Sequence, residues 1–148
     1  MTTDQFTKDD LTLTQPRLRH DAALRMVMLA ADAATAAGVP QCITVCDAGG
    51  TVIAQLRMDG ARLNALQISA VKARTSASTG SATSADPEDL AVAFATAGMQ
   101  TGLTGGLPIW IDGQLAGGIG VSSGPGDVDR ACAMAAFAIS PRLSWTAP

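Results

Sequence analysis

The segment Leu107–Ser123, LPIWIDGQLAGGIGVSS, carries the strongest structural signal in the sequence. Two apolar runs, 107–111 and 114–122, are separated by the dipeptide Asp112-Gly113. This dipeptide favours a two-residue turn between antiparallel strands, because both residue types tolerate a positive φ. Apolar side chains fall on both faces of the two runs, which is typical of strands covered above and below. The segment therefore predicts a hairpin in the centre of a sheet.

A second hairpin is predicted on the N-terminal side, with Gly49 and Gly50 as a two-residue loop and Ala48 paired with Thr51. This register gives one apolar face, composed of Ile43, Val45, Ala54, Leu56 and Met58. The opposite face is mixed, and Arg57 projects from it opposite Cys42. Two-residue turns cannot connect parallel strands, so a Rossmann-type sheet is disfavoured.

Four helices are predicted around the hairpins, at about 16–37, 65–77, 87–96 and 128–138. Thr14, Asp86 and Asp127 are the expected caps of the first, third and last helix, and Gly38 ends the first. The first helix is apolar on most sides, which suits a subunit interface or a tight contact with the sheet. The order of elements predicts an α+β fold with helices on both faces of an antiparallel sheet.

The length of 148 residues fits one domain with a proper core. We assign residues 13–140 to this domain, 1–12 to a flexible N-terminal arm and 141–148 to a C-terminal tail. Hydrophobic residues make up 47% and charged residues 16%, which argues against disorder. The net charge of −3, the pI near 4.8 and the absence of Tyr argue against nucleic acid as a partner.

The apolar stretch Met26–Ala31 is interrupted by Asp32 and is far shorter than the roughly 20 residues of a membrane span. No basic segment followed by an apolar one indicates secretion, so the cytoplasm is the expected location. The three cysteines are then expected as reduced thiols with structural roles. Cys42 and Cys46 lie roughly 13 Å apart on a strand, too far for one metal or one disulfide.

The segment Gly117–Asp127, GGIGVSSGPGD, leads from a strand into a helix N-terminus, where an anion or carboxylate can bind. It matches neither of the glycine-rich phosphate-binding patterns. The alternative is that its glycines let a helix press on the sheet while Asp127 caps the last helix. Both interpretations are open from the sequence.

His20 is the only histidine, and it is flanked by Arg19 and Asp21. No carboxylate or cysteine cluster accompanies it in the sequence, so a zinc site or a Ser-His-Asp triad lacks parts. A solvated surface histidine is one interpretation. An axial haem ligand is the other, since it requires only one histidine.

Arg57, Asp59 and Lys72 are charged residues near the corner that follows the first hairpin. They predict either an ion pair at the corner or a pocket. In the pocket, Arg57 binds an anion, Asp59 orients the groups, and a partly desolvated Lys72 acts as acid or base.

The segments VPQCITVCDAGGTVIAQLRMDGARLNALQISAVKARTSA and GGLPIWIDGQLAGGIGVSSGPGDVD resemble the GlcG/HbpS-like haem-binding family, which includes the C-terminal domain of PduO. The resemblance covers about Leu11–Ile139. It implies a profilin-like three-layer α/β/α sandwich, homo-oligomers, and roles linked to haem or corrinoids. Some haem-binding members use a histidine in the first helix, and His20 lies in the corresponding region.

The family motifs also imply which residues form the site. Asp47, Arg57, Asp59 and Lys72 recur together in the family. Our other candidate ligand-binding residues are Gly106 and Pro108 of the G-G-x-P motif, together with Ser122 and Ser123. Three hypotheses follow: a protein that binds haem or a related tetrapyrrole through His20; a cofactor-independent lyase or isomerase acting on a small oxygenated acid; and an oligomeric scaffold without chemistry.

Overall fold

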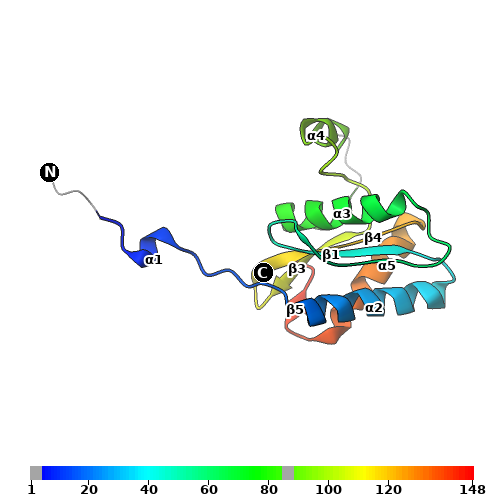
Figure 1. Ribbon diagram of the computed structural model, residues 1–148, viewed down its shortest axis with the longest axis horizontal. Coiled ribbons are helices and arrows are strands. Elements are labelled where there is room, and N and C mark those ends of the chain that lie inside the picture. Colours follow the sequence, from blue (N-terminus) through cyan, green and yellow to red (C-terminus); the bar gives the residue numbers. More distant parts are fainter. Residues whose placement is uncertain (1–4, 85–88) are drawn as a thin grey trace.

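The computed structural model describes residues 5–84 and 89–148. Its strands form one antiparallel sheet in the order β2-β1-β4-β3-β5. The strands are β1 (Cys42–Asp47), β2 (Val52–Arg57), β3 (Gly106–Ile111), β4 (Gln114–Ser122) and β5 (Leu143–Ser144). Helices α2 (His20–Ala37) and α5 (Gly126–Ala135) cover one face, and α3 (Ala65–Thr79) covers the other (Figure 1). The predicted α+β class and its three α/β/α layers are confirmed.

Two short helices lie outside the three layers. Helix α1 (Lys8–Leu11) belongs to an N-terminal segment that extends away from the domain, and α4 (Asp89–Ala95) stands beyond α3 (Figure 1). A 3₁₀ turn, η1 (Ala136–Ile139), follows α5. The predicted start of α4 at Pro87 and its cap Asp86 lie outside the described residues, as do residues 1–4 of the expected arm.

The β3–β4 hairpin has the predicted two-residue turn. Asp112 and Gly113 have φ values of 49° and 80°, and Ile111 pairs with Gln114. Because β4 also pairs with β1 along its length, it is the central strand of the sheet. The prediction from the Asp-Gly dipeptide is confirmed.

The β1–β2 hairpin has the predicted register, with Cys42 opposite Arg57, but a different turn. A bulge follows Val45, and the loop contains three residues, 48–50, instead of two. Only Gly50 has a positive φ, of 83°. The side chain of Asp47 accounts for the difference, because its Oδ1 accepts the N–H groups of Gly49 and Thr51, both at 3.0 Å.

Helix α2 begins four residues later than predicted, at His20, with Arg19 at its N-cap position. The preceding segment is extended and buries Leu18, which is 6% exposed, against the core. Thr14 is therefore not the cap. Asp21 instead accepts the N–H of Ala22 within the first turn. The predicted end at Gly38 is confirmed, with a φ of 68° there.

The glycines of β4 allow the backbone of α3 to touch the sheet. A Cβ built on Gly118 would lie 2.1 Å from the carbonyl oxygen of Ala73, and one on Gly120 would lie 2.0 Å from that of Ser69. The packing interpretation of these glycines is therefore correct. The apolar spacing of α3 predicts a stripe of Leu66, Ala70, Ala73 and Ala77. Only the last two of these are buried, and they face the sheet together with Ala65, Ser69, Lys72 and Ser76.

The end of the chain takes part in the domain instead of forming a free tail. Leu143 and Ser144 pair with Ile111 and Trp110 as β5. The ring of Trp145 packs edge-on against Phe137, with centroids 5.2 Å apart. Helix α5 begins at Gly126 with Pro125 at the N-cap position, so Asp127 is not its cap. Within the described ranges, no helix has the length and apolar character needed to cross a bilayer.

Candidate functional site

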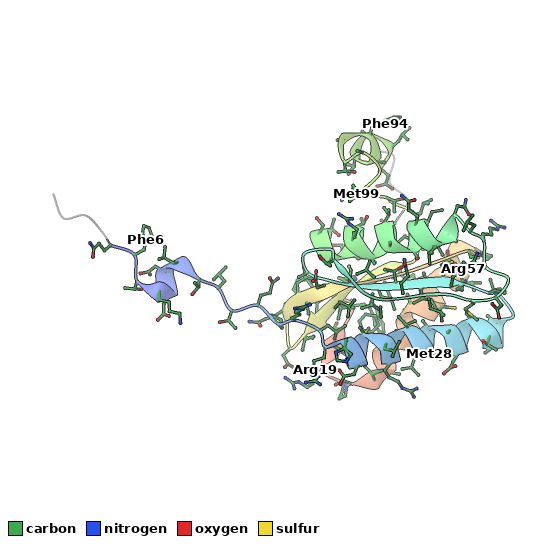
Figure 2. The ribbon with its side chains drawn as sticks, in the orientation of Figure 1. Phe6, Arg19, Met28, Arg57, Phe94 and Met99 are labelled. Atoms are coloured by element: carbon green, nitrogen blue, oxygen red, sulfur yellow. The ribbon has the colours of Figure 1, made fainter. Side chains whose placement is uncertain are left out.

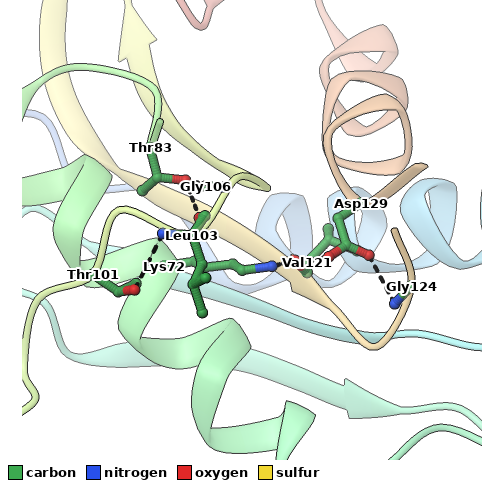
Figure 3. Close-up of polar contacts among 8 residues, drawn as sticks. All are labelled: Lys72, Thr83, Thr101, Leu103, Gly106, Val121, Gly124 and Asp129. Atoms are coloured by element: carbon green, nitrogen blue, oxygen red, sulfur yellow. Dashed lines mark hydrogen bonds and ion pairs between the residues drawn. The ribbon is translucent and has the colours of Figure 1, made fainter. Parts of the chain in front are cut away.

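Lys72 and Asp129 form a buried ion pair at the end of β4 (Figure 3). The Nζ of Lys72 lies 2.9 Å from Oδ2 of Asp129 and donates a second hydrogen bond, of 2.8 Å, to the carbonyl oxygen of Val121. Both charged side chains are only 3% exposed. The other carboxylate oxygen of Asp129 accepts the N–H of Gly124 at 3.0 Å. The pair therefore connects α3, β4 and the start of α5.

The surroundings of this pair are tightly packed. Burial lowers the pKa of the Lys72 ammonium below its usual value, while the hydrogen bond and the charge of Asp129 act in the opposite direction. The amide of Gln41 is fully buried nearby, and neither of its polar atoms has a partner in the described part of the chain. A Cβ on Gly124 would meet both Gln41 Nε2, at 2.7 Å, and Asp129 Oδ1, at 3.1 Å.

Arg57 and Asp59 do not converge with Lys72 on one pocket, which corrects the sequence-based expectation. Both are exposed, and Figure 2 shows Arg57 at the outer edge of the sheet. Across residues 5–84 and 89–148, neither forms an ion pair with the other or with Lys72. The physical reason is that α3 crosses over β4, where the glycines permit close approach. Its lysine therefore meets Asp129 and not the edge strand β2.

The other predicted ligand-binding residues lie in structural positions. Asp47 closes the β1–β2 turn. Gly106 donates its N–H to a threonine hydroxyl at 2.8 Å, and Pro108 is fully buried in β3. Ser122 is 6% exposed, and the hydroxyl of Ser123 accepts an N–H from the loop before α3 at 3.0 Å. Ser122 ends β4, and Ser123 precedes Gly124, whose N–H binds Asp129. A ligand role for these five residues stays a prediction.

His20 lies on an exposed apolar face of α2. It is the first residue of the helix, and Leu24 and Met28 follow at intervals of four residues, so the three side chains share one side of α2. Leu24 is 56% exposed and Met28 is 44% exposed. Figure 2 shows Met28 on the outer side of the helix. Among the described residues, no group of three or more His, Cys, Asp or Glu side chains could hold a metal ion.

The largest described cavity lies on the opposite side of the sheet, next to α3. Its volume is about 540 Å³, and it is bounded by the β1–β2 turn, the second half of α3 and residues 96–100. Arg74, Ser78 and Gln100 are among its polar lining residues. None of the cavities described here is lined by Lys72, Arg57 or Asp59.

Sequence reasoning missed Asp129 and Arg74. Asp129 lies 57 residues from Lys72, and the adjacent Asp127 has the more familiar pattern of a helix cap. A lysine on the sheet-facing side of a helix was nevertheless a usable signal, because a buried ammonium requires an acidic partner. No local pattern marks Arg74, since the cavity beside it depends on a distant segment, 96–100.

The thiol of Cys46 is expected to be inert in the native protein. Cys46 is fully buried beside Ala73 and Ala77, and burial raises the pKa of its thiol to about 11. At pH 8 only ~0.1% of the thiol is then ionised, and reagents have no access to it. We expect iodoacetamide to modify Cys46 at least ~100-fold more slowly in the native protein than in urea, measured by mass spectrometry. Equal rates in the two conditions would contradict this burial.

Comparison with known proteins identifies the family of this chain. The family described as "Haem degrading protein HbpS-like" matches residues 18–138. The GlcG protein of Escherichia coli strain K12 is 42% identical over 84 residues, which cover 54% of this chain and 62% of GlcG. The match therefore spans less than two thirds of that relative.

Two solved structures share the fold over nearly their whole length. The crystal structure of HbpS has 30% identity and a TM-score of 0.80, with 91% of this chain and 97% of HbpS covered. The crystal structure of a PduOC–haem complex has 25% identity and a TM-score of 0.79, with 88% and 99% covered. The family match extends from just before α2 to η1 and so includes all three layers. The chain belongs to the HbpS-like family.

Proposed function

We propose that the protein binds haem or a related tetrapyrrole, with His20 as the axial ligand. The observation that carries this proposal is the position of the only histidine at the end of an exposed apolar face of α2. Membership of the HbpS-like family and the haem complex of PduOC support the choice of ligand. Haem would supply a redox-active iron, whose reactivity depends on the axial ligand and on the polarity around it.

The residues of this face fit a porphyrin. The imidazole of His20 forms no hydrogen bond with any described residue, so a ring nitrogen is available for a metal. Leu24 lies one turn along and offers an aliphatic surface for a porphyrin ring. Arg17 is an exposed cation three residues before His20 and can pair with a propionate.

A second copy of the chain is part of the proposal. One helix face covers only one side of a flat ligand, and Leu24 and Met28 remain exposed in a single chain. Association through α2 would cover both these side chains and the second side of the porphyrin. We therefore propose a homo-oligomer. The three free cysteines support a reducing compartment such as the cytoplasm.

The lyase or isomerase alternative receives less support from the geometry. It required Lys72 to exchange protons with a substrate, yet this side chain is 3% exposed and its ammonium binds Asp129 and Val121. Arg57 and Asp59, which were to bind and orient the substrate, are both exposed, at the end of β2 and in the turn that follows it. The ligand-binding proposal is therefore preferred.

Haem titration tests the role of His20. We expect haem added to the wild-type protein to give a shifted Soret band, and His20→Ala to weaken binding at least ~10-fold, which corresponds to ~1.4 kcal/mol. Arg25→Ala is the matched control, because Arg25 is also exposed on α2 but lies on a different side of the helix. The absence of a wild-type Soret shift, or equal affinity in His20→Ala, would contradict the proposal.

A further inference from the structure

The cavity next to α3 lies on the face of the sheet opposite the proposed haem-binding surface. Helix α2 covers one face of the sheet, whereas α3 and the segment beyond it lie on the other (Figure 1). The cavity volume of about 540 Å³ falls within the range of roughly 300–1,000 Å³ that is typical of small-molecule sites. This cavity is therefore a second candidate site that does not depend on haem binding.

Among the described residues, Arg74 is the only charged one that lines this cavity. It is half-buried, and it forms no ion pair or hydrogen bond with another residue in the described ranges. Its side chain lies along the β1–β2 turn, where a Cβ on Gly50 would come within 3.4 Å of Arg74 Nε. The guanidinium thus lies against the turn, and its donors have no partner among the described residues.

The remaining polar groups of the lining are neutral. The hydroxyl of Thr75 is already engaged, because it donates to Val71 and accepts the N–H of Thr101, and so positions the segment above α3. Ser78 and Gln100 form no hydrogen bond through their side chains among the described residues, and both line the cavity. Among the described residues, the lining therefore offers one cation, one unengaged hydroxyl and one amide, and no carboxylate.

We propose that this cavity binds a small organic anion that carries a carboxylate and a neighbouring hydroxyl or oxo group. A planar guanidinium recognises a carboxylate through two parallel hydrogen bonds. The hydroxyl of Ser78 and the amide of Gln100 can each donate to or accept from the second oxygenated group. The described lining residues include no acidic side chain that would repel negative charge, which favours an anion over a neutral or cationic ligand.

Isothermal titration calorimetry with defined probes tests this site. The probes are lactate, pyruvate and malate, and lactamide is the neutral analogue of lactate. We expect at least one carboxylate to bind with a Kd below about 10 mM and lactamide to bind at least ~10-fold more weakly. The amide NMR signals of Gly50, Ser78 and Gln100 should shift on binding.

Substitution of the arginine separates the site from non-specific charge effects. Arg74→Gln should weaken carboxylate binding at least ~10-fold, and Arg74→Lys should weaken it as well, because a lysine keeps the charge but loses the paired donors. Arg130→Gln is the matched control, since Arg130 is exposed on α5 at the opposite face. Thermal unfolding of each variant verifies the fold.

Several results would overturn the proposal. One is that no carboxylate probe binds at about 20 mM. Another is that lactamide and lactate bind equally well. A third is that Arg74→Gln and Arg130→Gln lose the same amount of carboxylate affinity. Haem titration of Arg74→Gln shows whether this variant also affects the proposed haem site at His20. A normal Soret shift with lost carboxylate binding supports two separate sites, whereas lost haem binding would contradict the separation.

Discussion

Replacing Lys72 with methionine is expected to lower the free energy of unfolding by about 3–5 kcal/mol, because the carboxylate of Asp129 remains buried without its cation. Among the described residues, only the N–H of Gly124 then still donates to that carboxylate. Asp129→Asn should cause a loss of similar size, since the ammonium of Lys72 then keeps only the carbonyl oxygen of Val121 as a strong acceptor. Urea denaturation of the purified variants measures both effects.

A double variant makes this prediction specific to the pair. Lys72→Met with Asp129→Asn removes both charges, so its loss should be clearly smaller than the sum of the two single losses. Arg142→Met is the matched control, because it breaks the exposed ion pair with Asp112 and should have a much smaller effect. Additive losses in the double variant, or single losses as small as that of Arg142→Met, would contradict the argument.

The second large effect is expected for Gly120→Ala. The added methyl group would lie 2.0 Å from the carbonyl oxygen of Ser69 and 2.6 Å from the amide nitrogen of Ala73, both in the backbone of α3. A helix backbone cannot yield as a flexible side chain does, so α3 must move away from β4. We expect a loss of at least about 3 kcal/mol, at the upper end of the range for overpacked cores.

Gly38→Ala separates overpacking from backbone strain. Gly38 has a φ of 68°, and a Cβ there would meet no atom within 4 Å, so only the left-handed conformation opposes the alanine. This control should cost about 1–2 kcal/mol. Gly120 does not have a positive φ, so its effect measures the contact alone. A loss for Gly120→Ala no greater than that of Gly38→Ala would show that α3 can adjust without strain.

Much of the fold was predictable from short-range patterns. The dipeptide Asp112-Gly113 determined one turn correctly, and the alternation of apolar residues gave the register that places Cys42 opposite Arg57. The details that were predicted wrongly depend on individual side-chain contacts, which the periodicity of the sequence does not reveal. Asp47 lengthened the first turn by one residue, and the burial of Leu18 kept the segment before α2 extended.

The candidate site was less predictable because its contacts are long-range. Lys72 was recognised as important, but its partner Asp129 is 57 residues away and becomes its neighbour only when α5 packs beside β4. The three charged residues at the corner were close in sequence, which favoured an association that the fold does not make. Arg74 acquires its surroundings from residues 96–100, whose position over α3 has no sequence signature.

The backbone contact between α3 and β4 also determines how the molecule can move. The backbone of α3 packs against Gly118 at Ala73 and against Gly120 at Ser69, one helical turn away. If the helix shifted along the sheet by a fraction of a turn, its backbone would collide with β4. The residues of α3 that line the Arg74 cavity belong to the helix that this contact keeps in register with the sheet. Residues 96–100 line the same cavity but belong to no helix or strand, so we expect the cavity to adjust to a ligand through them and not through α3.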